Sequence, residues 1–276
     1  MRKSQTALKE KDLHPLALRP SALISEHGRA VPEAEYWEQY ARFCGAGDFD
    51  YEWRNGYLEE KGMSNYLNIL MYQWFVDVLR RFLEVFPIGK LLAVEMAFRL
   101  ALPGVTAIRK PDLAVVLDTN PIPLRSFDSS YTGTYDLCVE LISDDALRDI
   151  RRDTVEKKRE YARAGVKEYY ILDVRGVYMA FYRRNRRTGK YAPIPELADG
   201  IVESSVLRGF RFRVADLYQQ PSLQAMADDP VYQAFMLPFY QAEKQRAAQL
   251  TAQLAEERAR AECLAARLRE LGIAVD

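Results

Sequence analysis

The chain has 276 residues, of which 49% are hydrophobic and 12% aromatic, and its 39 basic residues balance 39 acidic ones. This composition supports a sizeable core and excludes a wholly disordered or fibrous chain, and the charge balance excludes a uniformly basic coat for nucleic acid. Cys44, Cys138 and Cys263 lie far apart without a CxxC pair, so neither a disulfide framework nor a structural zinc site is expected. This use of cysteine predicts a cytoplasmic location. His14 and His27 both lie near the N-terminus, which excludes histidine-based catalysis and histidine-bound metal from the rest of the chain.

Residues 1–29 are expected to form a flexible arm, and they lack the apolar stretch of a signal peptide. Charges such as Asp77, Glu95 and Arg99 interrupt the apolar segments elsewhere, so no membrane partner is expected. After the arm, the dipeptide Asn55-Gly56 between aromatic-rich flanks predicts a β-hairpin.

Helical and strand-like segments follow one another in the body of the chain. Apolar residues at three- and four-residue spacing predict a core helix over 64–86 with Ser64 as its N-cap, and Gly165 is placed to cap a second helix over 145–164. The strand-like runs are 91–102, 111–117, 135–143, 168–174 and 177–184, the last two forming a hairpin. A mixed α/β or α+β domain is therefore expected.

The last part of the chain changes in character. From about Gln241 the sequence is rich in Ala, Glu, Arg, Gln and Leu, and a heptad pattern runs from Ala247 to Leu271 with only Glu257 breaking its apolar seam. This pattern predicts a C-terminal coiled-coil helix that joins two copies as a homodimer. Docking of the helix onto its own globular domain is the alternative.

Two carboxylates and an ammonium group carry the chemistry. Asp112 follows Pro111 at the start of a predicted strand, Glu140 lies inside an apolar run, and Lys157 lies on the second predicted helix. Mg²⁺ is usually bound through one or two carboxylates, and an ammonium can offset charge on a phosphodiester. Each residue also has a structural interpretation: Asp112 in a turn, Glu140 pointing outward from an edge strand, and Lys157 as a solvated helix residue.

The order of these motifs resembles the Uma-two family of endonucleases. KPDLAVVLD (110–118), YDLCVELIS (135–143) and DTVEKKREYARAGVKEYYILDV (153–174) carry the resemblance, and YEWRNGYLEEKGMSN and the C-terminal LRELGIAVD extend it over nearly all of 48–276. The resemblance implies a restriction-endonuclease-like PD-(D/E)XK core, with a mixed sheet flanked by helices. It also implies cleavage of phosphodiester bonds in nucleic acid, with DNA as the expected substrate.

The resemblance further assigns roles to individual residues. It implies that Asp112 and Glu140 bind Mg²⁺, for which Mn²⁺ can substitute, with the backbone carbonyl of Leu141 as a further ligand. It implies Lys157 as the catalytic lysine. The auxiliary residues that it suggests are Glu95, Asp153 and Tyr161.

The lysine departs from the pattern of the wider nuclease superfamily. That pattern places the lysine two residues after the acidic residue, where this chain has Ile142, so the ammonium must come from the helix. Lys157 is preferred over Lys158 because it keeps a four-residue spacing from Asp153 and to Tyr161. A shift of one residue turns a side chain by about 100° around a helix.

A basic segment lies beside these residues. Positions 151–190 contain 13 Lys and Arg against five Asp and Glu. The candidates for contact with a nucleic-acid backbone are Arg183, Arg184, Arg186 and Arg187, and a solvated hairpin rim is the alternative interpretation.

These expectations combine into one organisation and three functional hypotheses. The arm at 1–29 precedes a restriction-endonuclease-like domain at 30–225, a connector at 226–240 and the coiled-coil tail at 241–276. The preferred function is that of a Mg²⁺-dependent endonuclease. The alternatives are a catalytically silent nuclease-like binding module, and an assembly protein that acts through the tail.

Overall fold

A computed structural model describes residues 24–41, 49–62, 65–93, 96–142 and 146–270. Within them, a six-stranded mixed sheet forms the centre of the fold, in the order β10-β9-β8-β7-β6-β3. The pair β7–β8 is parallel and the other neighbours are antiparallel. The strands are β3 (Gly89–Leu92), β6 (Leu113–Leu117), β7 (Leu137–Leu141), β8 (Glu168–Leu172), β9 (Ala180–Arg184) and β10 (Tyr191–Pro193).

A second, four-stranded sheet has the order β2-β1-β5-β4. Its strands are β1 (Tyr51–Arg54), β2 (Tyr57–Glu60), β4 (Phe98–Leu102) and β5 (Val105–Arg109). The β1–β2 hairpin turns at Asn55-Gly56, where φ is positive at both residues, which confirms the predicted hairpin. The strand expected over 91–102 is instead divided between the two sheets, as β3 and β4.

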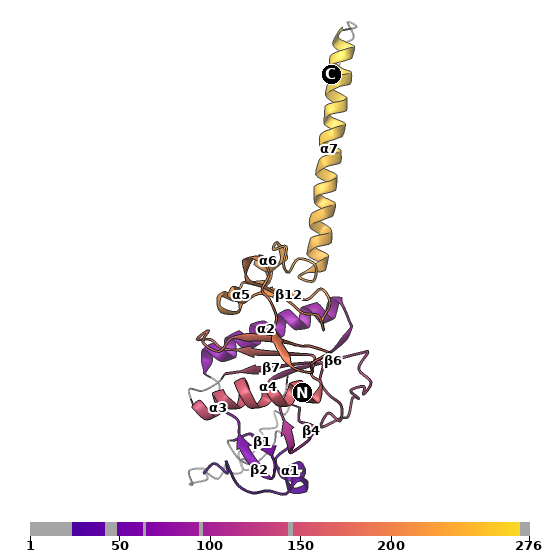
Figure 1. Ribbon diagram of the computed structural model, residues 1–276. Coiled ribbons are helices and arrows are strands. Elements are labelled where there is room, and N and C mark those ends of the chain that lie inside the picture. The colour runs from indigo at the N-terminus through magenta and orange to yellow at the C-terminus, as the bar shows by residue number, and fades with distance from the viewer. Residues whose placement is uncertain (1–23, 42–48, 63–64, 94–95, 143–145, 271–276) are drawn as a thin grey trace, which may run out of the picture.

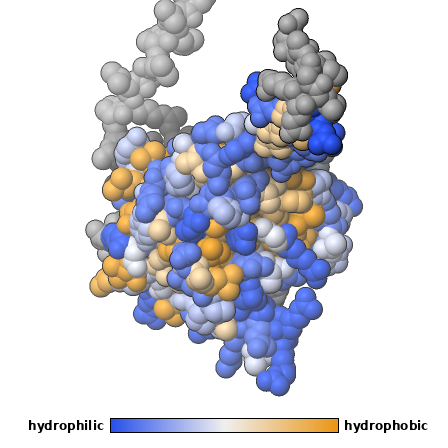
Figure 2. All heavy atoms as spheres, turned by 90° about the horizontal axis from the view of Figure 1, so that it is seen from above, coloured by the Kyte–Doolittle hydropathy of each residue, from blue (hydrophilic) through white to orange (hydrophobic). Residues whose placement is uncertain are grey.

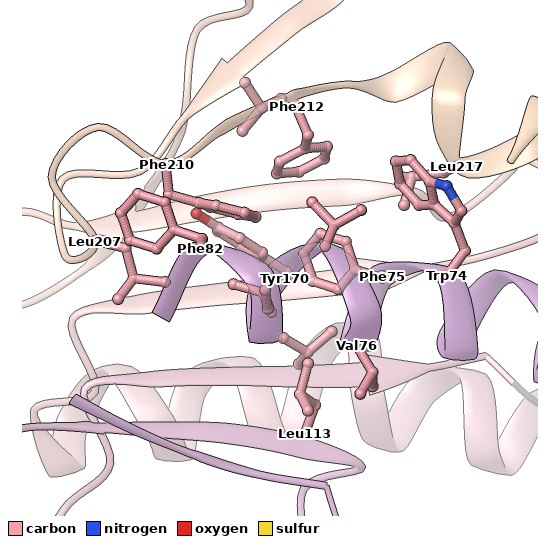
Figure 3. Packing of buried hydrophobic residues seen from close by; sticks show 14 of the residues in the cluster. Trp74, Phe75, Val76, Phe82, Leu113, Tyr170, Leu207, Phe210, Phe212 and Leu217 are labelled. Atoms are coloured by element: carbon pink, nitrogen blue, oxygen red, sulfur yellow. The ribbon is translucent and has the colours of Figure 1, made fainter. Parts of the chain in front are cut away.

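Helix α2 (Tyr66–Val85) covers one face of the six-stranded sheet (Figure 1). Its N-cap is Asn65, one residue beyond the expected Ser64: the side chain of Asn65 accepts a hydrogen bond from the backbone N–H of Asn68 at 3.0 Å, and Ser64 lies outside the described residues. Phe75 and Phe82 of α2 pack against Phe210 and Phe212 (Figure 3). Burial of each such side chain contributes about 1.5–3 kcal/mol to folding.

The C-terminal part of the globular unit closes over α2. It contains the 3₁₀ turn η2 (Ala198–Gly200), β11 (Ile201–Glu203), β12 (Arg211–Arg213), α5 (Val214–Gln219) and α6 (Leu223–Ala227). Within the segment expected to be a connector over 226–240, Val231, Tyr232, Phe235 and Met236 are buried in the same core as α2. Apolar burial therefore continues past the expected end of the domain at residue 225.

The opposite face of the six-stranded sheet carries three consecutive helical segments, namely α3 (Leu147–Arg151), the π-helical turn η1 (Arg152–Lys157) and α4 (Lys158–Ala164). The expected helix over 145–164 is thus present, with a π-helical turn in its middle, and Gly165 ends it with φ of 99° as predicted. In Figure 1 this helical layer lies between the six-stranded sheet and the four-stranded sheet. The short helix α1 (Glu33–Gln39) packs on the outer side of the four-stranded sheet through Tyr36.

The last described element is a single long helix, α7 (Pro238–Glu270). It projects away from the globular unit in Figure 1. Among the described residues, no helix combines the length and the apolar character needed to cross a bilayer.

Candidate active site

The site is built on two neighbouring strands of the six-stranded sheet. The β6–β7 register pairs Ala114 with Cys138 and Leu113 with Val139, so the same register carried one residue further sets Asp112 opposite Glu140. Side chains directly opposite in an antiparallel pair lie about 4.5–5.5 Å apart at their Cβ atoms. Because side chains alternate along a strand, both carboxylates face the helical layer η1–α4.

Asp112 is held by one backbone N–H group and one lysine. Its Oδ2 accepts a 2.7 Å hydrogen bond from the N–H of Leu141, and its Oδ1 lies 2.9 Å from Nζ of Lys61. Burial acts to raise the pKa of Asp112, but the ammonium groups of Lys61 and Lys157 and the Leu141 N–H outweigh it and hold this pKa below its usual range. Asp112 is therefore ionised at neutral pH.

Glu140 lies deeper than Asp112, with 2% of its side chain exposed. Its Oε2 is 2.8 Å from Nζ of Lys157, and its Oε1 accepts a 2.7 Å hydrogen bond from the hydroxyl of Tyr161. Burial, followed by repulsion from Asp112, Asp153 and other carboxylates, raises the pKa of Glu140 to about 8 despite the attraction of Lys157. Glu140 is thus more easily protonated than an ordinary glutamate.

Lys157 connects three carboxylates. In addition to Glu140, its Nζ lies 3.2 Å from Oε1 of Glu52 and 3.1 Å from Oδ1 of Asp153. Burial acts to lower the pKa of Lys157, and these carboxylates together raise it above its usual value. Lys158 points elsewhere, with its Nζ 3.7 Å from the centre of the Tyr182 ring.

Glu52 is a site residue that the sequence analysis did not identify. It lies on β1 in the second sheet and is fully buried, and its Oε1 also accepts a 2.8 Å hydrogen bond from the N–H of Lys110. Burial acts to raise the pKa of Glu52, but Lys157 and Arg109 hold it well below the usual range. A signal was available in the sequence, because Glu52 lies between the aromatic residues Tyr51 and Trp53. Successive side chains of a strand point to opposite faces of the sheet, so Glu52 faces away from both aromatic residues.

Arginine side chains tie the second sheet to the helical layer around the site. Arg109 of β5 is fully buried and contacts Glu52, Glu59 and Glu160, the last at 2.8 Å. Arg152 donates a 2.6 Å hydrogen bond to the backbone carbonyl of Glu60. These contacts hold the four-stranded sheet against η1 and α4, the segments on which Lys157 and Tyr161 lie.

The remaining predicted residues divide into four groups. Asp153 and Tyr161 lie at the site, and Glu95 lies outside the described residues. Two of the four arginines make structural contacts: Arg183 pairs with buried Glu168 at 3.0 Å, and Arg184 donates to the carbonyl of Ala162 at 2.6 Å. Arg186 and Arg187 are exposed on the β9–β10 turn.

The donors at the site suit a hard divalent cation. Asp112 and Glu140 supply carboxylate oxygens from adjacent strands, with the Leu141 backbone next to them, and Mg²⁺ commonly uses one or two carboxylates with water completing its shell. Within the described parts of the chain, no group of three or more His, Cys, Asp or Glu side chains is arranged to hold a metal ion. The carboxylates of Asp112 and Asp153 repel that of Glu140, and a bound cation would offset this repulsion.

Comparison with known proteins agrees with this architecture. The sequence model of the Uma2 family, described as "Putative restriction endonuclease", matches residues 37–215, which confirms the resemblance found in the sequence. A crystal structure of a "putative nuclease belonging to DUF820" from Anabaena variabilis ATCC 29413 is similar in fold, with a TM-score of 0.52 and 14% sequence identity, over 67% of this chain and 96% of that one. A search of curated proteins gives no match.

Proposed function

The chain belongs to the Uma2 family of restriction-endonuclease-like proteins, and from this premise we propose that it is a Mg²⁺-dependent endonuclease that hydrolyses phosphodiester bonds in DNA. One observation carries the proposal: carboxylates from adjacent strands, Asp112 and Glu140, share a site with the buried ammonium of Lys157, 2.8 Å from Glu140. Metal-assisted hydrolysis of a phosphodiester bond needs oxygen ligands for the ion, and a nearby cation can offset the charge on the phosphate.

Each residue has a role that follows from its contacts. Asp112, Glu140 and the carbonyl of Leu141 would hold the metal ion, which when bound supplies Lewis-acid polarisation of a phosphoryl oxygen and a nucleophile formed from water. Lys157 would offset the negative charge that develops on the phosphate in the transition state. Tyr161 fixes the orientation of Glu140 through its 2.7 Å hydrogen bond, and Glu52 and Asp153 keep Lys157 protonated.

Two exposed arginines on the β9–β10 turn suit the nucleic-acid backbone. Of the four predicted arginines, Arg183 and Arg184 make the structural contacts described above, and Arg186 and Arg187 are exposed. We assign phosphate contacts to Arg186 and Arg187. Such contacts contribute affinity without reading the base sequence.

The metal site is tested with the variants Asp112→Asn and Glu140→Gln, which remove charge and preserve shape. Each is expected to lower Mg²⁺-dependent cleavage of supercoiled plasmid DNA at least about 100-fold, because the metal and the charge of the transition state depend on both groups. Circular dichroism checks that both variants fold: Glu140→Gln relieves repulsion from Asp112 and Asp153, whereas Asp112→Asn removes the charged partner of Lys61 and should be the less stable of the two.

Asp118→Asn is a matched control, because Asp118 is a half-exposed aspartate at the far end of β6 that pairs with Lys90. It should cleave at the wild-type rate. Wild-type cleavage by Asp112→Asn or Glu140→Gln would overturn the site assignment. DNA binding without cleavage by the wild-type protein would instead support the silent binding module.

A further inference from the structure

Lys61 holds the position on Asp112 that a metal ion would need. Its Nζ lies 2.9 Å from Oδ1 of Asp112 and 2.7 Å from the backbone carbonyl oxygen of Lys110. The other carboxylate oxygen of Asp112 already accepts the N–H of Leu141. Oδ1 is therefore the oxygen left for a cation, and an ammonium group contacts it.

Asp112 is the most exposed of the charged residues at the site, so an ion from solvent reaches the site at Asp112. The Asp112 side chain is 18% exposed, whereas the side chains of Glu140, Lys157 and Glu52 are exposed by 2%, 1% and 0%. The Lys61 side chain is 9% exposed, so it too is nearer to solvent than Glu140 and Lys157. An ion that arrives from solvent meets Asp112 and Lys61 first.

The two lysines contact different proposed metal ligands, Lys157 at Glu140 and Lys61 at Asp112. Lys157 contacts Glu140, Glu52 and Asp153 through its ammonium. Lys61 contacts Asp112, which Lys157 reaches only through longer-range attraction. Lys61 therefore has a different role from Lys157, because it contacts the proposed metal ligand Asp112 directly.

We propose that Lys61 is a positioning residue that gates the metal site: its ammonium occupies the cation position on Asp112 in the metal-free protein, and divalent cations bind only by displacing it. This inference rests on the proposed function, because it takes Asp112 as a metal ligand. The physical reason is competition, since a divalent ion about 2.1 Å from a carboxylate oxygen cannot share that oxygen with an ammonium at hydrogen-bond distance without strong repulsion.

The test measures Mn²⁺ binding to the full chain by electron paramagnetic resonance, without substrate. Lys61→Gln keeps an N–H donor for the Lys110 carbonyl and removes the charge. We expect its dissociation constant for Mn²⁺ to fall roughly tenfold or more. Lys90→Gln is the matched control, because Lys90 pairs with Asp118 at 3.1 Å on the surface, and it should bind Mn²⁺ as the wild type does.

A second measurement uses the wild-type protein and does not depend on how the variant folds. Limited acetylation followed by peptide mass spectrometry should show more modification at Lys61 when Mg²⁺ is saturating, because displacement frees its amine, and unchanged modification at Lys90. Unchanged or lower reactivity of Lys61 with saturating Mg²⁺ would overturn the proposal.

The outcomes separate this inference from the proposed function. If the wild type and Lys61→Gln bind Mn²⁺ equally while Asp112→Asn does not bind it, the gate is wrong and the metal site stands. If none of the three proteins binds Mn²⁺, or if Asp112→Asn binds it as the wild type does, the metal site fails and the gate fails with it.

Discussion

At the scale of single residues, the site is a cluster of buried charges that balance one another. Asp112, Glu140, Asp153 and Glu52 face the ammonium groups of Lys61 and Lys157, with guanidinium groups behind them. Removing one member of a buried charge pair is costly because the partner remains desolvated, and such changes commonly cost about 3–5 kcal/mol. Substitutions at the site must therefore be compared with variants that preserve the balance.

Lys157 and Lys158 provide such a comparison on adjacent positions. Lys157→Met should lower the cleavage rate roughly 100-fold or more, because the lost ammonium faces Glu140 and the expected phosphate position. Lys158→Met removes a contact with the Tyr182 ring and should change the rate less than about twofold. The measurement is single-turnover cleavage of a labelled duplex at saturating Mg²⁺.

Lys157→Arg separates the catalytic effect from stability, because it keeps a positive charge among the three carboxylates. It should unfold closer to the wild-type temperature than Lys157→Met and should still cleave slowly. Equal rate losses for Lys157→Met and Lys158→Met would contradict the assignment of Lys157.

The sequence indicated some of these residues and not others, for a physical reason. Asp112 and Glu140 lie in recognisable strands, and the four-residue spacing from Asp153 to Lys157 is local, so their positions follow from strand and helix geometry. Glu52 and Lys61 reach the site only because the four-stranded sheet packs on the helical layer. Local spacing carries no information about that packing.

At the scale of elements, the segment α3–η1–α4 sets the geometry of the site. The π-helical turn spans Arg152–Lys157 and so contains Arg152, Asp153 and Lys157, which all contact the site cluster. π-helical turns are rare and frequently occur at functional sites. The sequence predicted a helix here, but the widened turn could not be predicted, because it depends on the contacts of Arg152 and Lys157 with the second sheet.

The end of this segment is open to a direct test at Gly165. Its φ is 99°, and a Cβ added there would meet no atom within 4 Å, so the cost of Gly165→Ala is backbone strain alone. We expect Gly165→Ala to lower the free energy of unfolding by about 1–2 kcal/mol. Gly165→Asn is the control and should lower the free energy of unfolding by less, because Asn tolerates the left-handed conformation. Urea unfolding measures both, and equal losses would contradict the strain argument.

Other elements show which local signals were sufficient. The β1–β2 hairpin and the end of α4 were predicted correctly, because Asn55-Gly56 and Gly165 impose positive φ locally. The run 91–102 was predicted as one strand, and the structure divides it between two sheets, because continuous hydrophobicity does not specify which sheet a strand joins. The burial of Tyr232 and Phe235 was likewise missed, since prolines nearby resembled a linker.

At the scale of the whole molecule, α7 stands apart from the globular unit. The 33-residue helix is about 50 Å long at 1.5 Å per residue, and Figure 1 shows it extending from the rest of the fold. The surface viewed from the α7 end mixes hydrophilic and hydrophobic residues, without one large uniform area (Figure 2). Along α7, Leu250, Leu254 and Leu264 are exposed by 59%, 54% and 65%.

We propose that α7 joins two copies of the chain as a coiled-coil homodimer. The exposed leucines fall on the seam predicted from the heptad pattern, and a helix with a regular apolar stripe gains stability by burying it against an identical stripe. The first turns of α7 contact the globular unit, as in the pair between Lys244 and Asp228 at 2.6 Å. The structure thus gives no support to folding of the stripe back onto the globular unit, within the described residues.

Two pairs of substitutions test the dimer on the full-length chain. Leu254→Lys with Leu264→Lys places charges in the seam, so light scattering should show a shift from the mass of a dimer towards that of a monomer. Ala252→Lys with Ala266→Lys adds the same charge on the opposite side of the helix, where the heptad pattern exposes it, and should leave the dimer intact. Because Ala247, Glu257 and Ala261 weaken the seam, the dimer should dissociate on dilution. A monomeric wild type, or an unchanged mass for Leu254→Lys with Leu264→Lys, would show that α7 does not join two chains.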